Sequence, residues 1–181
     1  MTTDSLDNPI EIVDPGDATG IVTFNVKDVY SAKGVPYTHV SAIVQEGHGV
    51  HLELAGMLAF DHDGDILGGD TYHQTMNILG KIAHVICISA KHFSNSNYRP
   101  ASIGESMDSI DRSINGIVKT RVDLLDPDGW TPEGIAGVNR AYQKHNLLKP
   151  RTMVGVSRLP LQASGALVEI TASAFLKYGT F

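Results

Sequence analysis

Cysteine is nearly absent from this chain of 181 residues, whose only one is Cys87. A single thiol cannot close an intrachain disulfide or supply a thiolate zinc cluster, so disulfide-stabilised scaffolds are excluded and a reducing, cytoplasmic location is expected. Long apolar runs are missing as well, and the first residues lack the basic and apolar regions of a secretory signal. We therefore expect neither a membrane span nor a signal peptide.

An excess of basic residues is also missing. The chain has 14 Lys and Arg against 20 Asp and Glu, and residues 1–20 contain five of the acids and no base, which leaves 15 acids against 14 bases in the rest. A protein that neutralises phosphates needs a basic surface, so neither nucleic acid nor an anionic membrane is expected as a partner. The acidic first segment, residues 1–20, is predicted to form a tail, and residues 21–181 are predicted to form a single domain.

What the chain does contain is an alternation of strand and helix patterns. Strands are predicted over residues 21–26, 40–44, 50–58, 117–125, 152–157 and 166–175. A helix is expected from Thr71, which matches a capping box with Gln74, to about residue 92. A second is expected from the N-cap Thr131 to about residue 145, and the Ser- and Asn-rich residues 92–109 between them are predicted to be a polar loop insertion. This order predicts an α+β domain in which a mixed sheet has both helices on one face.

Two groups of possible metal ligands are interpreted as turns. The three aspartates between residues 61 and 65 alternate like the start of an EF-hand loop, but the glycine is misplaced and the terminal bidentate acid is missing. His48 and His51 flank a Gly-rich turn without the ligand spacing of zinc sites. Cys87 lies among apolar neighbours in the first predicted helix and is interpreted as a small buried hydrophobe. We expect no metal and no cofactor.

The strongest chemical pattern lies near the C-terminus, in two blocks. The first is Arg151-Thr-Met-Val-Gly-Val-Ser-Arg-Leu-Pro160, and the second is the Val-Glu-Ile run at residues 168–170. Arg151 opens a predicted strand, and its planar guanidinium offers a two-pronged fork to a carboxylate and stays charged when desolvated. Glu169 lies between apolar neighbours on a strand, so alternation places it on the opposite face from them, toward solvent or into a cleft.

These two blocks resemble the closing signature of the RidA/YjgF family of reactive-intermediate (enamine/imine) deaminases. Further landmarks of that family follow in order between about Gly34 and Leu176. They are Pro36-Tyr37, Ala55-Gly56, Gly68-Gly69-Asp70 with Gln74-Thr75, Val118-Lys119-Thr120, and Val138-Asn139 with Ala141-Tyr142. Several spaced motifs in one order rarely occur together by chance, which makes the resemblance specific.

The resemblance implies a chorismate-mutase-like fold, assembled as a homotrimer with ligand clefts between neighbouring subunits. It implies that Arg151 binds the carboxylate of a small-molecule substrate and that Glu169 helps to place an attacking water. Tyr37, Gly56 and Asn139 would line the cleft. The implied reaction hydrolyses a 2-imino acid to a 2-oxo acid and ammonia, which requires positioning and polarisation and no covalent intermediate.

Three positions depart from the family pattern. Met153, also expected in the cleft, stands where a small Thr or Cys is common, Pro150 directly precedes Arg151, and Ala55 replaces a frequent Ser. These departures predict a specialised branch with a reshaped cleft floor, such as an aminomuconate-type deaminase. They also leave open an alternative function, a non-catalytic trimeric protein that binds or senses a 2-oxo acid or another carboxylate.

Overall fold

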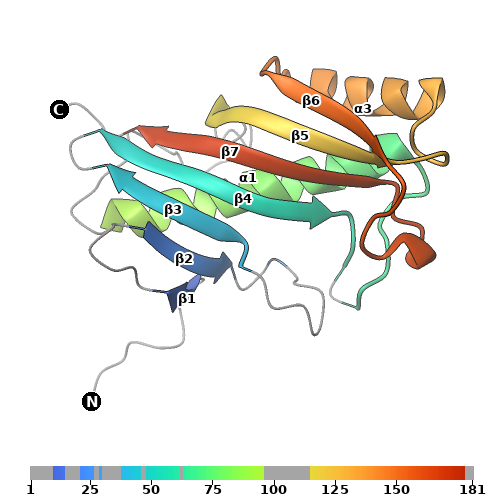
Figure 1. The fold of residues 1–181 in the computed structure, drawn as a ribbon. Helices are drawn as coiled ribbons and strands as arrows, with labels where there is room; N and C mark the ends of the chain where they lie inside the picture. The colour runs from blue at the N-terminus through green and yellow to red at the C-terminus, as the bar shows by residue number, and fades with distance from the viewer. Residues whose placement is uncertain are drawn as a thin grey trace.

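Strands and helices follow one another along the chain much as the sequence predicts (Figure 1). The computed structural model describes residues 10–14, 21–26, 29, 38–45, 48–61, 63–95 and 115–177. Its strands are β1 (Ile10–Asp14), β2 (Ile21–Val26), β3 (Val40–Gln45), β4 (Gly49–Leu58), β5 (Ile117–Leu125), β6 (Arg151–Val156) and β7 (Val168–Lys177). Its helices are α1 (Thr71–Asn95), α3 (Pro132–Lys144) and the short 3₁₀ turn η1 (Gln162–Ser164).

The strands of the described residues form one mixed sheet in the order β1-β2-β3-β4-β7-β5-β6. Neighbouring strands are antiparallel except β5 and β6, which are parallel and are connected through α3. A parallel pair needs such a crossover, because its second strand must start at the same end as its first. β6 lies at one edge of the sheet and β1 at the other. The predicted α+β class with a mixed sheet is confirmed.

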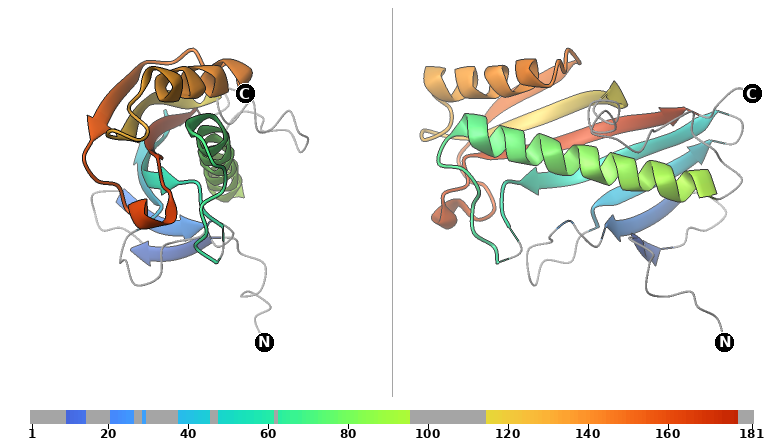
Figure 2. Two further views of the ribbon diagram at one scale, coloured as in Figure 1. Left: turned by 90° about the vertical axis from the view of Figure 1, so that its right-hand side faces the viewer. Right: turned by 180° about the vertical axis from the view of Figure 1, so that it is seen from behind.

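Both long helices cover the same face of the sheet, with α1 running obliquely across the strands and α3 beside it (Figure 2). The main hydrophobic core lies between these layers, and α1 contributes the fully buried Ile78, Ile82 and Ile86 to it. Although α1 is long, no helix in the described part of the chain combines the length and apolarity needed to cross a membrane. We call the opposite side of the sheet, which carries no helix among the described residues, the open face. Buried and less buried side chains alternate between the two faces along the strands.

Two segments differ from the prediction. Residues 10–14, expected in an acidic tail, form β1 and pair with β2, and Ile10 is buried against the core. The acidic composition of the surrounding residues concealed a short strand pattern, which the pairing with β2 stabilises. The first helix continues to Asn95, beyond the predicted end near residue 92. The rest of the predicted polar loop, residues 96–109, lies outside the described residues.

Helix α1 begins at the predicted residue but not through the predicted capping box. Asp70 is its N-cap, because Asp70 Oδ1 accepts a hydrogen bond of 2.8 Å from the backbone N–H three residues later. Thr71 is buried between the two helices and donates instead to the carbonyl of Gly134 at 2.9 Å. Gln74 bonds to backbone groups outside the helix. At α3 the predicted N-cap is confirmed, since Thr131 Oγ1 accepts from the Gly134 N–H at 3.0 Å.

The predicted turn at residues 61–65 is organised by its first aspartate. Asp61 Oδ1 accepts hydrogen bonds from the backbone N–H groups of Asp63 at 2.9 Å and Asp65 at 3.0 Å. Aspartate commonly closes turns in this way. The Asp61 carboxylate therefore has a structural role in this turn, as an acceptor for its backbone N–H groups.

Candidate functional site

Arg151 and Asn139, predicted to share a site, are in direct contact. Arg151 is the first residue of the edge strand β6, and Asn139 lies on α3. Arg151 Nη2 donates a hydrogen bond to Asn139 Oδ1 at 2.5 Å. The guanidinium also lies over the ring of Tyr142, with Cζ 4.2 Å from the ring centroid. These contacts orient a half-buried arginine on the helix side of the sheet, and its other N–H groups form no hydrogen bond with the described residues.

Tyr142 is a member of this cluster that the site prediction missed. Its hydroxyl donates to Thr120 Oγ1 at 2.9 Å, and Thr120 pairs in register with Arg151 across β5 and β6. Burial raises the pKa of Tyr142 to about 12, so the phenol stays neutral while its ring face attracts the cation. The i,i+3 spacing from Asn139 puts both side chains on one face of α3, and this spacing is the signal that could have indicated Tyr142.

Met153 lies on the same side of β6 as Arg151, because side chains two residues apart on a strand share a face. It is half-buried and packs against the main hydrophobic core. Its side chain therefore fills space beside the arginine that a small residue would leave open. Ala55 on β4 is also half-buried, and its backbone N–H donates to the carbonyl of His39 at 3.0 Å.

Glu169 and Gly56 form a second cluster, on the open face. Glu169 on β7 is paired with Leu58 of β4 and with Asp123 of β5. A Cβ on Gly56 would overlap the Glu169 carboxylate, so glycine is required for this close approach. Desolvation raises the pKa of Glu169, the negative charge of Asp123 raises it further, and the positive charge of Arg121 lowers it. A carboxylate whose pKa is raised accepts a proton more readily than an ordinary glutamate does.

The two clusters do not meet within one chain. Arg151 pairs with Thr120 on β5, whereas Glu169 pairs with Asp123, three residues later on the same strand. With a rise of about 3.3 Å per residue and about 4.8 Å between strands, the Cα atoms of Arg151 and Glu169 lie about 14 Å apart. The two side chains also project from opposite faces of the sheet. One small substrate therefore cannot contact both groups of the same chain.

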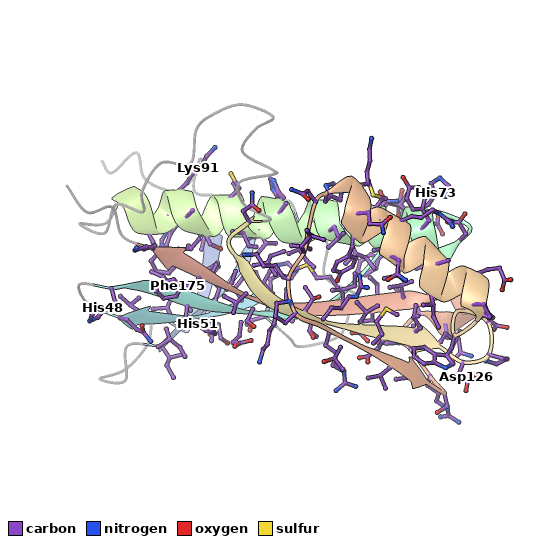
Figure 3. The ribbon with its side chains drawn as sticks, turned by 90° about the horizontal axis from the view of Figure 1, so that it is seen from above. His48, His51, His73, Lys91, Asp126 and Phe175 are labelled. Atoms are coloured by element: carbon purple, nitrogen blue, oxygen red, sulfur yellow. The ribbon has the colours of Figure 1, made fainter. Side chains whose placement is uncertain are left out.

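The remaining predicted site residue, Tyr37, lies outside the described residues, so its place in the cleft stays a prediction. Within the described ranges, no three His, Cys, Asp or Glu side chains gather in a way that could hold a metal ion. His48 and His51 lie near the turn that connects β3 to β4, and Phe175 of β7 lies beside His51 (Figure 3). There, His51 Nε2 is hydrogen-bonded to Glu53 Oε1 at 2.7 Å.

Comparisons with known proteins find a likeness at the level of structure. No protein-family model matches the sequence, and no curated protein matches it. A Rid-family protein of unknown function from Yersinia pestis, YyfA, is 25% identical with a TM-score of 0.57, over 86% of this chain and 98% of its own. The YjgF gene product of E. coli is 20% identical with a TM-score of 0.53, over 83% and 95%. RidA from an Antarctic Psychrobacter is 20% identical with a TM-score of 0.53, over 82% and 94%.

These solved structures match this chain over nearly their whole length. The chain therefore has the RidA/YjgF fold, and the family resemblance predicted from the two C-terminal blocks is confirmed. A fold of this kind can carry more than one function, so the chemistry of the chain rests on the side chains of its site.

Proposed function

We propose that the chain is a hydrolytic deaminase of enamine and imine intermediates, which converts a 2-imino acid to a 2-oxo acid and ammonia. The observation that carries this proposal is the half-buried Arg151 guanidinium, oriented by Asn139 and Tyr142. An oriented arginine at the start of an edge strand is suited to binding a carboxylate through two parallel hydrogen bonds. The RidA/YjgF fold supports the same assignment.

The proposed reaction is an addition followed by an elimination. The water oxygen forms a bond to the imine carbon, the C=N electron pair moves to nitrogen, and nitrogen takes up a proton to give a carbinolamine. The carbinolamine then reforms a C=O bond as nitrogen leaves with a further proton as ammonia. Arg151 holds the substrate carboxylate throughout, and Glu169 accepts a proton from the attacking water and returns it to nitrogen. The raised pKa of Glu169 suits this exchange.

We place the complete site between two subunits of a homotrimer. Arg151 and Asn139 of one subunit would face the Glu169 and Gly56 cluster of the next, because a single chain holds the two clusters about 14 Å apart on opposite faces. The edge position of β6 supports this arrangement, since a neighbouring subunit can approach Arg151 without displacing another strand. Tyr37 lining the cleft and a reducing, cytoplasmic location are parts of the same proposal.

The activity is tested with an imine generated in the assay by a pyridoxal-dependent dehydratase. The parent protein is expected to accelerate the release of 2-oxo acid and ammonia. Arg151→Ala is expected to raise KM at least about 10-fold, because a hydrogen bond to a charged group contributes about 1.5–3 kcal/mol. Arg158→Ala is the matched control, since Arg158 is exposed just beyond the same strand, and it should retain the parent rate. Unchanged kinetics in Arg151→Ala would refute the proposal.

The intersubunit placement has its own test. Arg151→Ala and Glu169→Gln are unfolded together, refolded and assayed as mixed trimers at a substrate concentration far below KM, where each variant alone is expected to have little activity. In a cyclic trimer that contains both variants, one site in three receives its arginine and its glutamate from unmutated positions. Random mixing also forms trimers of a single variant, which have no complete site, so it should restore about a quarter of the parent activity. If both groups acted from one subunit, mixing would restore none.

The alternative function has a distinct signature in the same assays. Saturable binding of 2-oxo acids that depends on Arg151, without acceleration of imine hydrolysis from several donors, would identify a carboxylate-binding protein. The packing of Met153 beside Arg151 is the feature that would then account for the loss of turnover, and Met153→Thr would test it.

A further inference from the structure

The part of the chain that carries Arg151 is basic, although the protein as a whole is acidic. Residues 134–168 contain five of the 14 Lys and Arg residues and no Asp or Glu, which leaves nine bases against all 20 acids in the rest. These five bases are Arg140, Lys144, Lys149, Arg151 and Arg158. A local excess of one charge sign attracts ligands of the opposite sign. The surroundings of Arg151 therefore favour a ligand with more than one negative charge.

Lys149 lies on the short connection from α3 to β6, which is fixed at both of its ends. On the α3 side, the N–H of Leu147 donates to the carbonyl of Tyr142 at 2.9 Å, and the Leu147 side chain is buried in the main hydrophobic core. On the β6 side, the carbonyl of Pro150 accepts a hydrogen bond of 3.1 Å from the N–H of Thr120 on β5. The backbone of Lys149 is therefore held in place, while its side chain is exposed.

Lys149 and Arg151 are close enough for both cations to contact one small ligand. The residue before a proline is restricted to extended conformations, so the residues on either side of Pro150 have Cα atoms about 7 Å apart. The ammonium of Lys149 ends a flexible four-carbon stem, and it forms no hydrogen bond or ion pair with the described residues. The guanidinium of Arg151 has further N–H groups besides the one that donates to Asn139. Both cations therefore have donors that no described residue uses.

The other described neighbours of Arg151 leave the Lys149 side as the exposed one. Two residues further along β6, Met153 is half-buried and packs against the main hydrophobic core. Asn139 and Tyr142 contact the guanidinium from α3. Lys149 precedes Arg151 along the chain, on the side away from Met153, and it is exposed. A substrate whose carboxylate is bound by Arg151 therefore has room to extend toward Lys149.

We propose that the substrate is a 2-imino dicarboxylic acid, whose carboxylate next to the imine carbon binds Arg151 and whose distal carboxylate binds Lys149. This inference rests on the proposed deamination and names its substrate class. The dimensions agree with a chain of five carbons, because four C–C bonds of about 1.5 Å separate its two carboxyl carbons by about 5 Å when extended. With a hydrogen bond of about 2.8 Å at each carboxylate, two side chains that start about 7 Å apart can reach both.

Binding of the corresponding products to the intact protein tests the substrate class without turnover. 2-Oxoglutarate carries both carboxylates, and 2-oxovalerate has the same five-carbon chain without the distal one. In titration calorimetry, 2-oxoglutarate is expected to bind at least about 5-fold more tightly than 2-oxovalerate. Lys149→Gln should bring the ratio of the two dissociation constants close to one, and Arg151→Ala should weaken the binding of both probes.

Lys144→Gln is the matched control, since it removes an equal charge from an exposed lysine at the end of α3. It should keep the preference for 2-oxoglutarate, and both lysine variants should unfold near the parent temperature because both side chains are exposed. The proposal is overturned if 2-oxovalerate binds as tightly as 2-oxoglutarate. It is also overturned if Lys144→Gln removes the preference as fully as Lys149→Gln does, because the preference would then come from the general charge of the segment.

Turnover separates this inference from the proposed deamination. An amino-acid oxidase generates the two imines in the assay, one from glutamate and one from norvaline. The parent is expected to hydrolyse the imine of glutamate with the lower KM, and Lys149→Gln should raise that KM at least about 5-fold while kcat changes little. Equal hydrolysis of both imines would overturn the substrate class and leave the deaminase in place. Binding of 2-oxoglutarate that depends on Lys149, without hydrolysis of either imine, would support the dicarboxylate site and overturn the deaminase.

Discussion

Replacing Gln74 by leucine is expected to destabilise the protein by about 3 kcal/mol and to loosen the segment that leads into Glu169. The Gln74 side chain is 1% exposed in the first turn of α1. Its Nε2 donates to the carbonyl of Gly68 at 3.0 Å and to that of Gly165 at 2.9 Å, and its Oε1 accepts from the N–H of Leu167 at 2.9 Å. One amide thus connects the start of α1 to the loop before it and to the chain entering β7.

The magnitude follows from the three backbone groups that leucine leaves without partners. A buried polar group that loses its partner costs about 1–3 kcal/mol. The lower end applies here, because Gly165 is exposed and water can reach part of the loop. Three groups at about 1 kcal/mol each give about 3 kcal/mol, which lowers the unfolding temperature by about 6–12 °C in a domain of this size.

Urea denaturation of Gln74→Leu against the parent measures this cost, and amide hydrogen exchange at Leu167 locates it. Gln74→Glu should be at least as destabilising, because it replaces the NH₂ donor with an acceptor that faces two carbonyls. Asn77→Ala is the matched control, since Asn77 is an exposed amide on the same helix that bonds only to its own turn, and it should stay within about 0.5 kcal/mol of the parent. A Gln74→Leu variant that falls within the same 0.5 kcal/mol would refute the reasoning.

Three further predictions concern single side chains, of which Thr75 is fully buried and Glu169 and Lys81 are half-buried. Thr75 is fully buried and its Oγ1 has no partner among the described residues, so Thr75→Val should stabilise the protein by about 1 kcal/mol in urea denaturation, and a loss of that size would contradict it. Because burial and the negative charge of Asp123 raise the pKa of Glu169 above its ordinary value of 4.5, parent stability should fall as pH rises above 4.5. Glu169→Gln should therefore unfold at a higher temperature than the parent at pH 7 and at a similar one at pH 4, whereas a pH-independent difference would argue against a raised pKa. Burial lowers the pKa of Lys81 from 10.5 to about 8. The stability of the parent relative to Lys81→Met should therefore rise between pH 8 and pH 10.5. A stability difference between the two proteins that does not change with pH would show that the ammonium stays solvated.

Elements whose signals are local could be predicted closely from the sequence. Residues 117–125 alternate apolar and polar side chains and form β5 over the same bounds. The Thr131-Pro132 pair places the start of α3, because an N-cap side chain and a proline act on the backbone of their own turn. Neither signal depends on a distant partner, which is why both predictions are confirmed.

Elements that depend on a partner could not be predicted in this way. β1 becomes a strand through its pairing with β2, although its five residues lie in an acidic segment. The Thr71 and Gln74 pair satisfies the capping-box pattern, yet both side chains bond to groups far away in the sequence. A pattern within one turn does not show which polar group a buried side chain will meet once the helix is packed.

The sequence by itself determined the chemistry that is available, namely an arginine at the start of a strand, whose guanidinium is able to bind a carboxylate, and a glutamate on the opposite face from its apolar neighbours. Only the tertiary structure decided which groups surround them. It placed Asn139 and Tyr142 on Arg151, set Glu169 against Gly56 on the other face, and so divided the predicted site into two clusters. The physical reason is that side-chain type and strand period are properties of the local chain, whereas register and helix docking are fixed by contacts between segments far apart in sequence.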